Sequence, residues 1–110
     1  MMDPKVYDGL VSAVFKKLLA AADAVDPDVL EADGTSEMVT FTAAGGQKVI
    51  VNTQRAAWQV WVAAGSQGIH FSWEGGAGAW RDDKGKGYEL LSFVRDAVRE
   101  ASGAELSLRP

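Results

Sequence analysis

The sequence predicts an α+β fold: a two-layer α-β sandwich in which N- and C-terminal helices pack on one face of an antiparallel sheet of five or six strands. Apolar residues recur at helical spacing near both ends of the chain and at every second position in its middle. The short connections between the middle segments favour antiparallel neighbours. A length of 110 residues suffices for one hydrophobic core, so we expect a single domain over residues 1–110.

The first helix is expected over residues 3–25. Asp3 suits the N-cap because its short carboxylate can accept a hydrogen bond from a free backbone N–H, and Pro4 suits the first helical position. Pro27 cannot continue a helix, so the pattern should end shortly before it. The apolar stripe that needs a sheet or helix beneath it consists of Val6, Tyr7, Leu10, Val11, Val14, Phe15, Leu18 and Leu19.

The second helix is expected from about residue 88 to residue 102. Gly103 follows it, and glycine readily adopts the left-handed conformation that ends many helices. The buried stripe would be formed by Leu91, Val94, Val98 and Ala101. The tail beyond Gly103 carries two leucines that could cover one end of the core.

Between the helices the apolar period changes to 2, the repeat of a strand with one buried face. Glycine-bearing turns separate the alternating segments, and none has the spacing of a phosphate-binding loop. The predicted strands cover residues 38–42, 48–54, 58–64 and 69–74. A short piece around Trp80 could add a strand at one end, and residues 30–33 a first edge strand at the other.

The same alternation separates the two faces of the sheet. One face is uniformly apolar and must lie under the helices; it consists of Val39, Phe41, Val49, Val51, Val60, Val62, Ile69, Phe71 and Trp73. The other is polar enough to meet water, as one face of an antiparallel sheet often does. This open face consists of Thr40, Thr42, Lys48, Ile50, Asn52, Gln54, Gln59, Trp61, Ala63, His70 and Ser72.

Trp61 is the exception on this polar face. One interpretation is a cross-strand packing pair, for example with Ile50. The other is an interface anchor with a largely exposed ring, since tryptophan among amide side chains offers both contact area and hydrogen bonds. The pattern alone leaves these two interpretations open. We assign Trp58 and Trp73 to the core, so we expect them to have packing roles only.

The charge distribution excludes some classes of partner. The formal net charge is −4 and no basic cluster is present, which argues against nucleic-acid binding. No apolar run is long enough to span a membrane and no targeting signal is visible, so we expect no membrane association and a cytoplasmic location. The chain has no cysteine, which excludes disulfides and thiolate metal sites.

Six carboxylates occur between Leu18 and Gln47 without a single Lys or Arg: Asp23, Asp26, Asp28, Glu31, Asp33 and Glu37. Such a stretch is commonly a solvated face that aids solubility. It also fits a docking surface for a basic partner or a hard cation, because carboxylate oxygens suit loosely held, hydrated metal ions. The spacing of an EF-hand is absent, so only weak binding is predicted.

The sequence offers no candidate catalytic residue. His70 is the only histidine, and a histidine without neighbouring ligands is commonly a surface or hydrogen-bonded residue. No Gly-x-Ser-x-Gly turn exposes a serine nucleophile. The pair Asp82-Asp83 is interpreted as a turn that also places negative charge before the second helix.

Three short motifs on the predicted sheet resemble the frataxin family, especially its bacterial CyaY-type members. They are Lys48-Val-Ile-Val-Asn-Thr-Gln54, Gln59-Val-Trp-Val-Ala63 and Gly68-Ile-His-Phe71. Trp80-Arg-Asp, Gly85 and Glu89-Leu-Leu91 fall where that family has its Trp, Asp, Gly and leucine-rich second helix. The order and spacing of these motifs carry the resemblance from the first helix to the second.

The resemblance implies a role in iron–sulfur cluster assembly, with cysteine desulfurase and an iron–sulfur scaffold protein as partners. Its implied partner-binding residues on the sheet are Asn52, Gln54, Gln59, Trp61 and His70. It also implies weak, reversible binding of iron (Fe²⁺ or Fe³⁺) by acidic residues, which here would be Asp23, Asp26, Asp28, Glu31 and Asp33. The expected protein is a non-enzymatic accessory factor that is monomeric without iron. An iron-oxidising, iron-storing oligomer and an iron-independent protein-binding module are the alternatives.

One departure from the family pattern concerns the first helix. Its second half is rich in Glu and Asp in the family, whereas here it contains Lys16, Lys17 and, among acids, only Asp23. Lysines lower the local negative potential and so weaken the capture of cations. We therefore expect the sheet motif to be better preserved than the acidic ridge.

Overall fold

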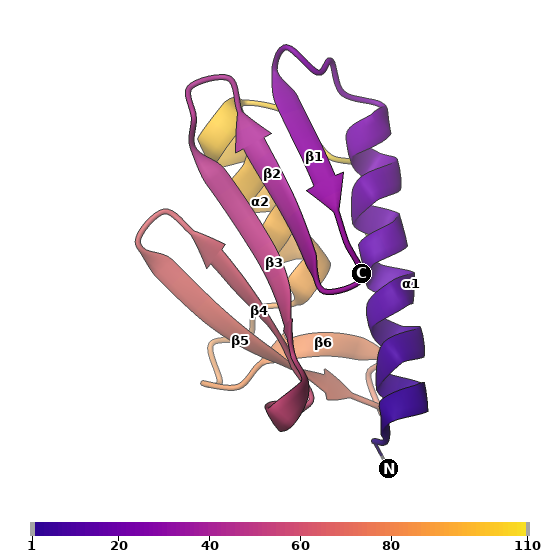
Figure 1. The fold of residues 1–110 in the computed structure, drawn as a ribbon. Coiled ribbons are helices and arrows are strands. Elements are labelled where there is room, and N and C mark those ends of the chain that lie inside the picture. Colours follow the sequence, from indigo (N-terminus) through magenta and orange to yellow (C-terminus); the bar gives the residue numbers. More distant parts are fainter. Residues whose placement is uncertain (1, 110) are drawn as a thin grey trace.

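A computed structural model describes residues 2–109. The elements follow one another in the order shown in Figure 1. They are α1 (Pro4–Asp23), β1 (Leu30–Gly34), β2 (Met38–Ala43), β3 (Lys48–Gln54), the 3₁₀ helix η1 (Arg55–Ala57), β4 (Gln59–Ala64), β5 (Gln67–Glu74), β6 (Ala79–Asp82) and α2 (Leu90–Ser102). No helix within the described residues is long and apolar enough to cross a membrane.

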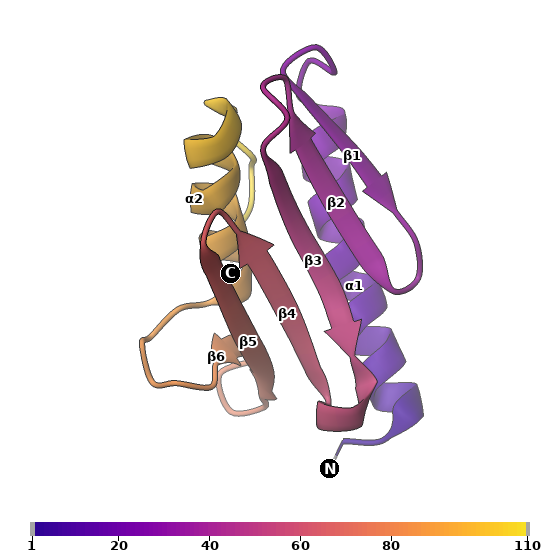
Figure 2. The ribbon, with the colours of Figure 1, turned by 60° about the vertical axis from the view of Figure 1, so that its left-hand side comes forward.

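The strands form one six-stranded antiparallel sheet in the order β1-β2-β3-β4-β5-β6. Both helices lie on the same side of this sheet, and the other side is left uncovered (Figures 1 and 2). This arrangement confirms the predicted two-layer sandwich, including the short first and last strands. The meander follows from connections that are too short for a crossover between parallel strands.

The boundaries of the helices depend on local caps. The side chain of Asp3 accepts a hydrogen bond from the Val6 N–H at 2.9 Å, so the predicted start of α1 is confirmed. α1 ends at Asp23, two residues before the predicted end. α2 begins at Leu90 rather than residue 88, because the carboxylate of Glu89 caps it by accepting from two backbone N–H groups of its first turn. Gly103 ends α2 in the left-handed conformation at φ 78°, as expected.

The hydrophobic core lies between the helices and the apolar face of the sheet. Eight of the nine residues predicted for that face are buried, namely Val39, Phe41, Val49, Val51, Val60, Val62, Ile69 and Phe71. Trp73 is only partly buried; its ring packs edge-on against the buried Trp80, with centroids 5.6 Å apart. Leu106 and Leu108 of the tail are buried in the same core.

The third predicted strand begins one residue later than expected. Trp58 is not in the strand but ends η1 in the left-handed conformation at φ 54°, where the chain turns back into β4. Its ring is partly buried and packs against Tyr7 of α1, with centroids 5.3 Å apart. Trp58 therefore lies outside the strand in which alternation places it. Its expected packing role is confirmed by the contact with Tyr7.

Candidate functional site on the open sheet face

One row of directly paired residues crosses the centre of the open face. Met38 lies opposite Asn52, Asn52 opposite Trp61, and Trp61 opposite His70. These four residues are called the Trp61 row below. Met38 is not among the residues predicted for the open face, although it alternates in phase with Thr40. Its side chain is exposed and extends the row to β2.

The ring of Trp61 stacks on the imidazole of His70, with ring centroids 4.1 Å apart and planes only 9° from parallel. The predicted largely exposed ring is therefore wrong, because His70 covers one of its faces and leaves Trp61 partly buried. The suggested pairing with Ile50 is also wrong, since Ile50 lies opposite Ala63 in the neighbouring row.

Gln59 supports the indole of Trp61 through its side-chain amide. The Trp61 Nε1–H donates to Gln59 Oε1 at 2.9 Å. Gln59 Nε2 in turn donates to Ser72 Oγ at 3.1 Å and to Asp83 Oδ2 at 3.0 Å. Both ends of this amide are thus engaged within the protein, and Gln59 is a supporting residue rather than a free contact.

The other two amide side chains predicted for the open face, those of Asn52 and Gln54, differ from Gln59 in their hydrogen bonding. The side chains of Asn52 and Gln54 are partly buried and make no hydrogen bond to any described residue. They are two positions apart on β3, so both project from the open face, about 7 Å from each other along the strand. Their donors and acceptors are available to a bound molecule.

Arg55 joins three segments beside the Trp61 row. Its guanidinium donates to Asp8 of α1 and, at 2.9 Å, to Glu37 in the connection before β2. Glu37 also accepts from the Thr53 hydroxyl. The bond from Arg55, followed by that from Thr53, holds the pKa of Glu37 below its usual value, and the two carboxylates raise the pKa of Arg55. This network fixes the chain immediately before Met38.

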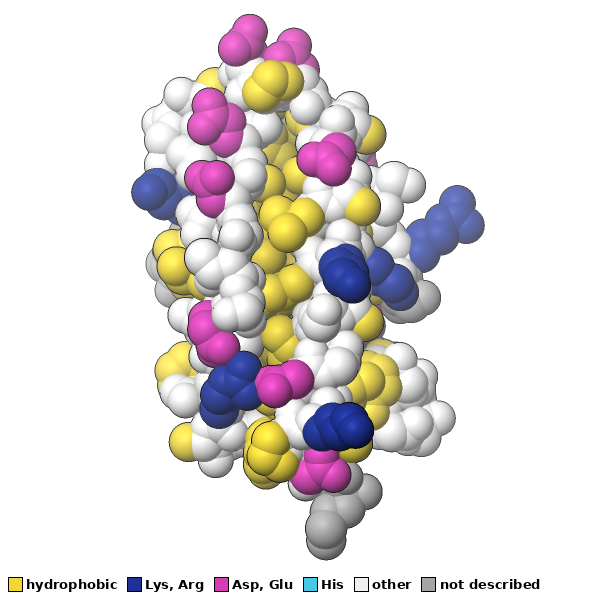
Figure 3. Space-filling model, turned by 45° about the vertical axis from the view of Figure 1, so that its right-hand side comes forward, with side chains coloured by type: hydrophobic (Ala, Val, Ile, Leu, Met, Phe, Trp, Pro, Cys, Tyr) yellow, Lys and Arg dark blue, Asp and Glu magenta, His cyan; other side chains and the backbone are white. Residues whose placement is uncertain are grey.

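The predicted iron-binding carboxylates lie along one border of the molecule, which is called the acidic edge below. Asp23 ends α1, Asp26 and Asp28 follow in the connection, and Glu31 and Asp33 are on β1. All five are exposed. Figure 3 shows acidic side chains gathered around the upper end of the molecule.

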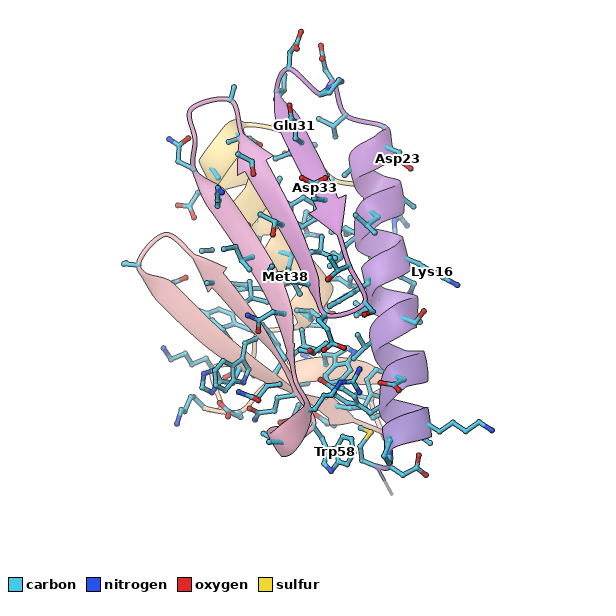
Figure 4. All side chains as sticks on the ribbon, viewed as in Figure 1. Lys16, Asp23, Glu31, Asp33, Met38 and Trp58 are labelled. Atoms are coloured by element: carbon cyan, nitrogen blue, oxygen red, sulfur yellow. The ribbon has the colours of Figure 1, made fainter. Side chains whose placement is uncertain are left out.

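The register connects part of the acidic edge to the open face. Glu31 lies opposite Thr42 and Asp33 opposite Thr40, so both carboxylates project on the side of the sheet that carries Trp61. Asp23 and Lys16, by contrast, project from α1 away from the sheet (Figure 4). Within residues 2–109 no three His, Cys, Asp or Glu side chains come together in a group that could hold a metal ion. The acidic edge therefore suits a hydrated, loosely held cation rather than a coordinated one.

Comparison with known proteins identifies the family of this chain. Residues 1–104 match the family model described as a frataxin-like domain. The chain belongs to the frataxin family. The resemblance inferred from the sheet motifs is thereby confirmed.

Curated members of the frataxin family match nearly the whole chain. The iron–sulfur cluster assembly protein CyaY of Tolumonas auensis is 34% identical over 107 residues, covering 97% of this chain and 99% of the relative. CyaY of Cupriavidus metallidurans is 37% identical, covering 96% and 87% of the two chains. The solved structure of frataxin from Psychromonas ingrahamii superposes with a TM-score of 0.84 at 24% identity, covering 96% of each chain, which confirms the frataxin fold.

The acidic pair Asp82-Asp83 of this frataxin-family chain lies at the predicted turn, which begins where β6 ends. Asp82 is buried and accepts hydrogen bonds from the backbone N–H groups of residues 84, 86 and 88, of which that of Lys86 contributes most to lowering the pKa of Asp82. Asp83 reaches the open face and Gln59. Neither carboxylate caps α2, because Glu89 does so. Asp83 is a second residue of the site that sequence reasoning missed, because only the tertiary structure brings it to β4.

Proposed function

We propose that this frataxin-family protein is a non-enzymatic accessory factor of iron–sulfur cluster assembly that binds the cysteine desulfurase–scaffold complex through its open sheet face. The observation that carries the proposal is that His70 and Gln59 hold the partly exposed indole of Trp61 in place. Beside it lie the side-chain amides of Asn52 and Gln54, which make no hydrogen bond with residues 2–109. A fixed aromatic ring with neighbouring unpaired hydrogen-bonding groups is typical of an interface anchor. The names of the relatives, which are iron–sulfur cluster assembly proteins, support the choice of partner.

A reconstituted assay with purified desulfurase and scaffold tests this proposal. We expect the protein to co-elute with the complex and to change the rate of sulfide release, with or without added iron. The double variant Asn52→Ala/Gln54→Ala should weaken binding by about tenfold or more, because both open amides are lost. A matched control is Ser36→Ala, an exposed residue outside the face. Absence of both co-elution and any rate change would contradict the proposal.

Iron is proposed as a weakly bound cargo of the acidic edge. Five exposed carboxylates supply hard oxygen donors, and their separation favours outer-sphere attraction. A titration with Fe²⁺ under anaerobic conditions, followed by NMR, should broaden the backbone signals of residues 23–33 before those of the Trp61 row. If residues 23–33 stay unmoved, the iron-independent protein-binding alternative is favoured. Size exclusion after iron loading separates a monomeric factor from an iron-storing oligomer.

A further inference from the structure

Asp83 lies just beyond the last strand, yet its side chain is part of the open face. Its backbone N–H donates to the carbonyl of His70 at 2.9 Å, which holds Asp83 beside β5. Its Oδ2 accepts from Gln59 Nε2 at 3.0 Å and lies 3.8 Å from His70 Nδ1. The side chain is 28% exposed, so the carboxylate is partly enclosed by the groups that it contacts.

The chemistry of these groups determines which way the Gln59 amide points. An amide can present either its oxygen or its NH₂ group to a neighbour, whereas a carboxylate only accepts and an indole N–H only donates. Asp83 therefore requires the NH₂ end of Gln59. The oxygen end is then directed at the Trp61 Nε1–H, with which it makes the observed 2.9 Å bond.

Ser72 does not make this selection, although Gln59 Nε2 is only 3.1 Å from its hydroxyl. A hydroxyl both donates and accepts, so it tolerates either orientation of the amide. Among the described contacts of Gln59, the acceptor-only partner of the NH₂ end is Asp83. If the amide turned over, its NH₂ group would face the indole N–H, and two donors would oppose each other.

We infer that Asp83 is a positioning residue for the Trp61 row: it selects one orientation of the Gln59 amide and thereby holds the Trp61 indole in the rotamer that stacks on His70. Asp83 acts through Gln59 and need not touch a partner. Its importance for binding rests on the proposed function, whereas its effect on the indole is a property of the free protein. The two parts are therefore measured separately.

The first measurement is the indole ¹H–¹⁵N signal of Trp61 in the free protein, assigned by its loss in Trp61→Phe. Asp83→Asn keeps the shape of the side chain but removes its acceptor-only character. We expect the Trp61 indole signal to shift and its hydrogen exchange to accelerate by about fivefold, the factor expected for one weakened hydrogen bond. The signals of the other three tryptophans should stay in place. Unchanged position and exchange of the Trp61 signal would overturn the inference.

A charge swap then distinguishes positioning from a general structural effect. In the double variant Gln59→Glu/Asp83→Asn, the carboxylate stands at position 59 and the amide at position 83. The carboxylate accepts from the indole and from the new amide NH₂ group, so donors and acceptors match again at the same net charge. We expect the Trp61 signal to return toward its wild-type position and exchange rate. A double variant no closer to wild type than Asp83→Asn would also overturn the inference.

The second measurement is affinity for the purified desulfurase–scaffold complex. Asp83→Asn should weaken binding by about three- to tenfold and the double variant should recover most of it, because the interface anchor is displaced and then restored. Glu74→Gln is the matched control, because Glu74 is an exposed acid at the end of β5 whose side chain makes no hydrogen bond or ion pair with residues 2–109. If even Trp61→Ala binds normally, the proposed function fails, while the indole signals still decide the positioning inference.

Discussion

Trp61 and His70 occupy opposite positions on β4 and β5, and their rings stack with centroids 4.1 Å apart. The stack resolves one of the questions that the sequence leaves open, because Trp61 does form a cross-strand packing pair. Its ring is nevertheless only partly buried. Packing by His70 and contact with a partner are therefore compatible roles of the same side chain, and the second remains a prediction.

Trp61→Ala should weaken binding to the desulfurase–scaffold complex by about tenfold or more, because a held aromatic ring is a typical binding anchor. The free energy of unfolding should fall by only about 1–2 kcal/mol, since one stacked, partly exposed ring is lost. Calorimetric titration and urea denaturation measure the two effects.

Trp58→Ala is the matched control for Trp61→Ala. Trp58 packs against Tyr7 of α1 rather than projecting from the open face. Its removal should lower the free energy of unfolding by about 2–4 kcal/mol and leave partner affinity within twofold of wild type. Equal losses of affinity in the two variants would contradict the assignment of the site to the open face.

The hydrogen bonds accepted by Glu37 should make a contribution to the free energy of unfolding that depends on pH. Its ionised carboxylate accepts from Arg55 and Thr53, and its pKa in the folded protein is lower than the ordinary value of 4.5. The stabilisation is therefore complete above about pH 4.5 and is lost as the pH falls through the lowered folded pKa. At pH 7 the wild type should have a higher melting temperature than Glu37→Gln. The difference between the two melting temperatures should disappear as the pH is lowered to 3.

Glu100→Gln provides the control for this pH series, because Glu100 is exposed on α2 and forms no ion pair with residues 2–109. It should melt within about one degree of wild type across the range. The gap shown by Glu37→Gln should also shrink at high salt, since the Arg55 pairs are exposed. A gap that widens in acid would contradict the assigned role of Glu37.

Tyr7 anchors α1 to the beginning of β4. Its ring is buried, and its hydroxyl donates to the Gln59 carbonyl at 2.6 Å. Tyr7→Phe should reduce the free energy of unfolding by about 1 kcal/mol, because that carbonyl loses its partner. Tyr88→Phe should have little effect, since the Tyr88 hydroxyl makes no hydrogen bond to the described residues. Denaturant unfolding of both variants measures the difference, as a lower midpoint for Tyr7→Phe with an unchanged slope of the transition. Equal midpoints for Tyr7→Phe and Tyr88→Phe would contradict the prediction.

Replacing Lys16 and Lys17 tests whether local charge changes the affinity of the acidic edge for Fe²⁺. Both are exposed on α1, and Lys16 projects away from the sheet (Figure 4). Lys16→Glu/Lys17→Glu should lower the dissociation constant of Fe²⁺ by about two- to fivefold at low salt, with the effect fading at high salt. Lys5→Glu, at the opposite end of the same helix, is the control with little effect. A response to Lys5→Glu of the same size would indicate net charge rather than local potential.

The two-layer fold and the separation of the sheet faces could be predicted from the sequence because side chains alternate along any strand, whatever its neighbours. The same rule placed Asn52, Gln54, Gln59, Trp61 and His70 on one open face, and the structure has them there. Local chemistry likewise determined the N-cap at Asp3 and the end of α2 at Gly103.

Only the tertiary structure decided how these residues use one another. Strand register sets Trp61 against His70 rather than Ile50, and a turn after β6 brings Asp83 to Gln59, 24 positions away in the chain. Neither contact has a local signal, because a hydrogen bond between distant residues depends on where the whole chain places them. The sequence by itself determined which side chains face outward. The tertiary structure decided that the Gln59 amide supports Trp61, while the side chains of Asn52 and Gln54 make no hydrogen bond with residues 2–109.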